Sequence, residues 1–200
     1  MLPNAIDELV NNAKILPLNT VLYSNWQIID ENGNILRDFS ESNYNDLSKF
    51  DFNVRLLDGQ QINVNTALIP SQFFKTLTFE NLDDPVAIDY DFFLRCALIA
   101  NANFHLVSKP LIQYRTHQSQ LSHKNIVQTL DYIEHVKNKI LSRISVNEKN
   151  NYLSSLQQYQ KSKPIHKKTL EFGLKMLSKS PSWASDRILI LYLSKIRRSR

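Results

Sequence analysis

The pattern of apolar residues changes near residue 124, and this change limits the folds open to the chain. Before it, runs rich in β-branched and aromatic residues alternate with helical spacing, as in TVLYSNWQIID (20–30) and IDYDFFLRCAL (88–98). After it, apolar residues recur every three or four positions from Ile126 to Ile144, which predicts a long amphipathic helix. We therefore predict an α/β fold: a mixed sheet with flanking helices, followed by an all-helical C-terminal tail.

Local signals place the elements of the first part. A helical stripe predicts a helix in NAIDELVNNAKIL (4–16) with Asn4 as its N-cap. The Asn32-Gly33 pair predicts a tight turn between two strands, because both residues tolerate the positive φ angles of hairpin turns. Residues 40–62 are polar and weakly patterned, and we predict a loop there. The other predictions are a short helix from Pro70-Ser71 to Phe74, a helix over 89–100, a strand over 104–107 that Lys109-Pro110 breaks, and a strand over 111–115.

The tail is predicted to hold several helices and to carry most of the positive charge. Residues 1–123 have 8 basic and 14 acidic side chains, whereas residues 124–200 have 16 and 5. This split predicts two units, an acidic one at 1–122 and a basic one at 123–200. Beyond the first tail helix, an interruption at 146–148 precedes helices over 149–161, 165–178 and from Ser180-Pro181 onward.

Composition excludes several classes of site. The three glycines are scattered, so a Walker loop and a GxGxxG dinucleotide motif are ruled out. A single cysteine, Cys96, excludes a disulfide framework and a multi-cysteine zinc site. No apolar run approaches about 18 residues, and the first residues do not form a signal peptide, so a cytoplasmic location is expected.

Two aspartates lie two residues apart at a predicted helix start. Asp89 and Asp91 are suited to act as a general base and a supporting acid, or only to compensate the positive end of the helix. Arg95 follows Asp91 by four residues, so the two face each other and are expected to pair. That pair would hold Asp91 and leave Asp89 available.

A polar segment follows the last predicted strand. Arg115, His117 and Ser119 could together bind phosphate oxygens, and a neutral imidazole is a common ligand for a divalent metal. A polar surface loop is the alternative interpretation. Trp26 could stack on a sugar ring, or could pack as a half-buried strand residue. We expect Cys96 to be inert packing.

Three stretches resemble a known enzyme family. They are VLYSNWQIIDENGNIL, NVNTALIPSQFFKTLTFENL, and the pair IDYDFFLR and PLIQYRTHQSQLS, which occur in the expected order and at the expected separation. In these stretches, over residues 1–122, the chain resembles the acceptor-side portion of a family 2 glycosyltransferase with the GT-A fold. The resemblance implies inverting transfer of a sugar from a nucleotide-sugar donor to the hydroxyl of a glycan or lipid-linked acceptor.

The resemblance also assigns roles residue by residue. Asp89 corresponds to the base that removes the proton of the acceptor hydroxyl, and Asp91 and Arg95 support it. His117 corresponds to the histidine associated with a divalent metal, Mn²⁺ or Mg²⁺. Arg115 and Ser119 would help to hold the leaving diphosphate, where negative charge develops. Apart from the resemblance, Trp26 is the residue that we expect to contact the acceptor.

The chain departs from the family pattern in two ways. Ile88 stands where a glutamate usually precedes the base. The family's N-terminal half, with its nucleotide site and metal-binding Asp-x-Asp, has no counterpart in these 200 residues. We therefore expect the chain to be the acceptor side of a larger enzyme, to be incomplete without a complementary N-terminal chain, and to have an open sheet edge.

Two other interpretations stay open from the sequence. The chain could be a non-catalytic module, derived from a glycosyltransferase, that binds a glycan or a membrane surface. Alternatively, the tail could be the functional part, with residues 181–200 on an anionic membrane surface at the inner membrane face, or in contact with RNA. Nucleic-acid motifs and interleaved aromatic residues are absent, so we expect no nucleic-acid partner.

Overall fold

The chain is a mixed α/β protein, as predicted, with several helices following the sheet. The computed structural model describes residues 1–59, 62–78, 88–115, 126–165, 168–169 and 173. Its elements, in chain order, are α1 (Ala5–Ala13), β1 (Thr20–Ile29), β2 (Ile35–Phe39), α2 (Lys49–Leu57), the 3-10 turn η1 (Val64–Thr66), α3 (Ser71–Thr76), α4 (Ile88–Leu98), β3 (Asn103–Arg115), α6 (Ile126–Leu141) and α7 (Val146–Ser162).

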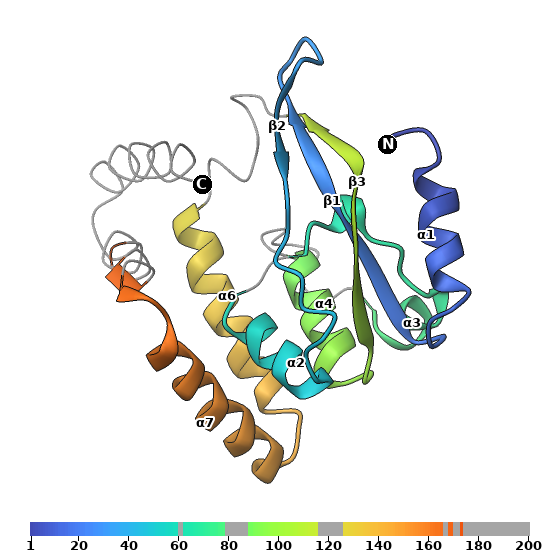
Figure 1. Cartoon of the computed structure of the whole chain (residues 1–200). Coiled ribbons are helices and arrows are strands. Elements are labelled where there is room, and N and C mark those ends of the chain that lie inside the picture. Colours follow the sequence, from blue (N-terminus) through green and yellow to red (C-terminus); the bar gives the residue numbers. More distant parts are fainter. Residues whose placement is uncertain (60–61, 79–87, 116–125, 166–167, 170–172, 174–200) are drawn as a thin grey trace.

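The described strands form one mixed sheet in the order β2-β1-β3 (Figure 1). β2 returns antiparallel to β1 through the predicted turn, in which Gly33 has a φ of 91°. Asp30 stabilises this turn by accepting hydrogen bonds from the backbone N–H groups of Asn32 (2.9 Å) and Asn34 (2.8 Å). β3 runs parallel to β1, and α2, α3 and α4 lie in the crossover between them.

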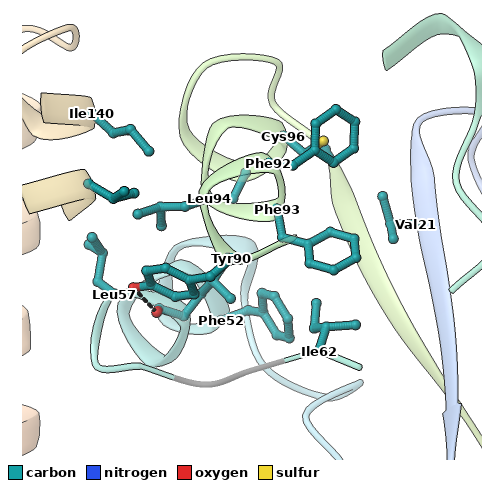
Figure 2. Close-up of a cluster of buried hydrophobic side chains, with 14 of the residues drawn as sticks. Val21, Phe52, Leu57, Ile62, Tyr90, Phe92, Phe93, Leu94, Cys96 and Ile140 are labelled. Carbon is teal, nitrogen blue, oxygen red and sulfur yellow. Dashed lines mark hydrogen bonds between the residues drawn. The ribbon is translucent and has the colours of Figure 1, made fainter. Parts of the chain in front are cut away.

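Helices cover the two faces of the sheet unequally. β1 sends alternate side chains to opposite faces, so Val21 and Tyr23 join one core cluster while Leu22 joins another. The larger cluster combines residues of α2, α4 and α6, whose aromatic and aliphatic side chains interlock in Figure 2. The smaller cluster is covered by α1 through Ala5 and Leu9. Among the described residues, the sheet is therefore packed heavily on one face and lightly on the other.

The loop predicted for residues 40–62 is partly wrong, because α2 lies within it. Ser48 caps α2, and its side chain accepts a hydrogen bond from the backbone N–H of Asp51 (3.1 Å). The helix buries Phe52, Leu56 and Leu57 in the larger cluster. Tertiary packing against α4 and α7 adds to the local signals of α2, which are its cap and its apolar side chains.

The strand break predicted at Lys109-Pro110 is also wrong. β3 continues through these residues, and the parallel pairing with β1 shifts from Ser24↔Val107 to Asn25↔Pro110. The extra residues form an irregularity in a strand at the edge of the described sheet. A proline is tolerated there, because its missing N–H need not join a ladder.

The predicted helix beginning at Ile126 is confirmed as α6, whose Ile133, Val136 and Ile140 enter the larger cluster with α4. The predicted interruption at 146–148 is the first turn of α7, where Ser145 and Glu148 form a reciprocal capping box. Asn4 occupies the cap position of α1 with a φ of 64° and no capping hydrogen bond from its side chain. The division at residues 122 and 123 and the last predicted helix lie outside the described residues.

Candidate functional site

α4 carries the predicted base in its first turn. Asp89 is half-buried, and one of its carboxylate oxygens, Oδ1, accepts a hydrogen bond from the backbone N–H of Tyr90 at 2.9 Å. Burial raises the pKa of Asp89, and the backbone hydrogen bonds oppose this only in part. In the part of the chain that the structure describes, Asp89 makes no ion pair. Its carboxylate is therefore a stronger base than an exposed aspartate.

Asp91 and Arg95 form the predicted pair, and the pair is buried. Arg95 Nη2 lies 2.9 Å from Asp91 Oδ2, and both side chains are 2% exposed. Arg95 Nε donates to the same oxygen at 3.2 Å, while Nη1 donates to the carbonyl oxygen of Thr78 at 2.6 Å. The ion pair thus joins α4 to the chain that follows α3.

The two aspartates have different surroundings because they lie two residues apart on one helix. Residues at this spacing do not share a helix face, so only one of them can turn toward Arg95. Asp91 does so, and Asp89 stays at the half-buried start of the helix. Asp91 is thus held in a buried ion pair, and the role of Asp89 as a base stays a prediction.

The sequence analysis missed how α4 is held against α2. The hydroxyl of Tyr90 donates to the backbone carbonyl of Leu56 at 2.9 Å, and its ring is buried in the larger cluster (Figure 2). Tyr90 is adjacent to Asp89, so this contact also restrains the start of α4. The available signal was the position of the tyrosine on the apolar side of a predicted helix, but its partner was hidden in the unpredicted α2.

Arg115 ends β3 and contacts the β1–β2 turn. Its Nη1 donates to the carbonyl oxygens of Asp30 (2.9 Å) and Glu31 (2.5 Å), while its side chain remains exposed. The structure thus shows that Arg115 braces the hairpin. The other two predicted members of its group, His117 and Ser119, lie outside the described residues, so diphosphate and metal binding there stay predictions.

Trp26 is a packed residue of β1. It is 8% exposed and stacks on Phe39 of β2, with ring centroids 4.2 Å apart. It belongs to the smaller cluster beneath α1. The structure therefore gives Trp26 a packing role, and contact with an acceptor sugar stays a prediction. Cys96 is fully buried as well, and burial raises its pKa to about 12.

The described residues do not assemble a metal centre. They bring together no group of three or more histidine, cysteine, aspartate or glutamate side chains. The donor set for a divalent metal is therefore not provided by the described part of this chain. In the same residues, no helix has the length and apolar character needed to span a bilayer.

The first turn of α4 thus carries a half-buried carboxylate of raised pKa on a helix that buried contacts hold in place. No family model matches the chain. The chain is similar to an uncharacterized glycosyltransferase of Rickettsia felis, with 28% identity over 123 residues. The similar region covers 61% of this chain, and the chain spans 20% of the length of that relative.

Proposed function

We propose that this chain is the acceptor-side part of an inverting family 2 glycosyltransferase, with Asp89 as its base. The observation that carries the proposal is the first turn of α4, where Arg95 holds Asp91 and burial raises the pKa of Asp89. The similarity to part of the Rickettsia felis protein supports sugar transfer as the reaction class.

In the proposed reaction, a carboxylate oxygen of Asp89 takes the proton from an acceptor hydroxyl. The acceptor oxygen attacks the anomeric carbon of the donor sugar while the bond from that carbon to the diphosphate oxygen breaks. The electron pair of that bond leaves with the nucleoside diphosphate. General base catalysis of this kind contributes roughly 10²–10⁴-fold, and a base is more effective when its pKa approaches the working pH.

The other proposed roles concern binding. Arg115 and Ser119 would hold the leaving diphosphate, and His117 would serve a divalent metal. A complementary N-terminal polypeptide would supply the nucleotide site. Residues 181–200 are proposed to hold the protein at an anionic membrane surface.

The test compares Asp89→Asn with Asp7→Asn, a matched change in the first turn of α1. Both proteins are assayed for sugar-nucleotide hydrolysis and transfer with manganese, together with a complementary N-terminal half where one is encoded upstream. We expect Asp89→Asn to lose roughly 10²–10⁴-fold in turnover and Asp7→Asn to keep it. Turnover that survives in Asp89→Asn contradicts the base assignment. Glycan binding by the wild type without turnover favours the non-catalytic module instead.

A further inference from the structure

β3 is the last strand of the described sheet, and one of its two edges faces away from β1 (Figure 1). At the start of β3, the backbone N–H of Asn103 donates to the carbonyl oxygen of Asn19, directly before β1, at 2.9 Å. The backbone groups of successive strand residues point to opposite sides, so those of Leu106, three residues further on, point away from β1. A further strand would have to bond to these outward groups.

The side chain of Asn45 takes the place of a neighbouring strand at Leu106. Asn45 Oδ1 accepts a hydrogen bond from the N–H of Leu106 at 2.8 Å, and Asn45 Nδ2 donates to the carbonyl oxygen of Leu106 at 3.0 Å. The loop that carries Asn45 is tied to the sheet a second time, because the N–H of Glu41 donates to Oδ1 of Asn25 in β1 at 2.8 Å. One half-buried amide thus occupies both outward backbone groups of a residue that lies 61 positions away in the chain.

The second half of this edge is closed by other means. The N–H of Leu2 donates to the carbonyl oxygen of Leu111 at 2.9 Å. Between the two halves, Pro110 has no N–H to offer, and Lys109 carries a charge that pairs with Glu8 at 2.6 Å. A strand added along β3 is therefore limited to the residues before Lys109, where Asn45 is the obstacle.

Residues 103–108 have the composition of a segment that pairs with copies of itself. Their sequence, NFHLVS, contains no proline, glycine, acidic residue, lysine or arginine. Burial lowers the pKa of the His105 imidazole, so the segment is uncharged at neutral pH. Short uncharged segments with strand-forming residues such as Phe104 and Val107 are typical of edge-to-edge association. An identical segment brings no charge repulsion, so a second copy of the chain is the partner that fits.

From these contacts we propose that Asn45 guards the edge of β3 against pairing with a second copy of this chain. Without the amide, residues 103–108 of two copies pair antiparallel, and the N–H and carbonyl groups of each Leu106 bond to the other copy. In the wild type, the two hydrogen bonds of Asn45 must break before such a pair forms. The proposal does not depend on sugar transfer.

The first experiment measures self-association of the full chain by light scattering over a series of concentrations at neutral pH. The variant is Asn45→Ala. The matched control is Asn12→Ala, which removes another half-buried amide whose Nδ2 donates to a backbone carbonyl, that of Glu8 within α1, at 2.8 Å. We expect Asn45→Ala to associate at concentrations about tenfold lower than the wild type, equivalent to about 1.4 kcal/mol. We expect Asn12→Ala to behave like the wild type.

A second variant separates edge pairing from a loss of stability. Asn45→Ala/Ser108→Lys places a positive charge at an exposed position of the segment, and the two copies then repel each other. We expect this double variant to associate no more than the wild type. Amide hydrogen exchange locates the contact: in Asn45→Ala, the Leu106 N–H should exchange fast in dilute protein and more slowly as the concentration rises.

Each measurement can contradict the proposal. It is wrong if Asn45→Ala associates no more readily than the wild type, or if the Leu106 N–H of this variant exchanges at the same rate at every concentration. Association of the double variant as strong as that of Asn45→Ala also contradicts it, because an exposed core rather than the strand edge then brings the copies together. Thermal unfolding of each variant controls for folding.

Discussion

The two faces of the sheet differ in how completely they are covered. One face is packed by α2, α4 and α6, which bury aromatic rings, aliphatic side chains and the Asp91–Arg95 ion pair. The other is covered by α1, beside which Ile15 and Leu18 remain exposed. The candidate base belongs to the heavily packed face, where its helix is firmly held. Beside the other face, the described residues leave these two apolar side chains exposed.

The largest loss of unfolding free energy is expected when a charge is removed from the heavily packed face. Asp91→Asn removes the buried carboxylate charge that lies 2.9 Å from Arg95 Nη2, and we expect the free energy of unfolding to fall by about 3–5 kcal/mol. Urea unfolding measures the change. The control is Glu134→Gln, which breaks the pair with Lys137 in which the glutamate is exposed, and it should cost less than about 1 kcal/mol. Equal losses would show that Asp91 and Arg95 are not buried as described.

A smaller loss of unfolding free energy is expected when a buried leucine on either face is replaced by alanine. Leu94 is fully buried among α2, α4 and α6, so Leu94→Ala leaves a cavity that its surroundings cannot close, and we expect a loss of about 3–4 kcal/mol. Leu9 of α1 lies in the smaller cluster, where α1 can shift inward, so Leu9→Ala should cost about 2 kcal/mol. Thermal unfolding ranks the two. A greater loss for Leu9→Ala would reverse our comparison of the faces.

The smallest expected effect has the opposite sign. Because burial raises the pKa of Asp89, ionising it costs more in the folded than in the unfolded protein. This cost of ionising Asp89 in the folded protein is absent at a pH below its ordinary pKa. It grows as the pH rises from the ordinary to the raised pKa, and it is complete above the raised pKa. We therefore expect Asp89→Asn to become more stable than the wild type as the pH rises through that window to neutrality.

Asp7→Asn is the control for this pH series, and it should lose about 0.3–1 kcal/mol through a weaker interaction with the positive end of α1. Urea unfolding of both variants across acid and neutral pH measures the difference. If Asp89→Asn also loses stability at neutral pH, Asp89 acts as an ordinary helix-start charge.

Much of the secondary structure could be predicted because its signals are local. The Asn32-Gly33 turn, the apolar stripe of α4 and the four-residue spacing of Asp91 and Arg95 each depend on neighbours in the chain. α2 was missed although Ser48 is a local N-cap signal, because polar residues surround the short helix and its packing partners α4 and α7 are distant in sequence. The strand through Pro110 was missed for a similar reason, since the register of β1 and the edge position permit it.

The candidate site shows the same division. The sequence alone predicted which residues form the first turn of α4 and that Asp91 pairs with Arg95. Local helix geometry suffices for this, because it sets which side chains share a face. The sequence also determined the α/β order and the uneven charge of the two parts of the chain. Only the tertiary structure decided the burial of Asp89, the anchoring of Tyr90 on α2, the packing of Trp26 and the exposure of Ile15 and Leu18. These depend on which elements meet in space, and burial is a property of that assembly.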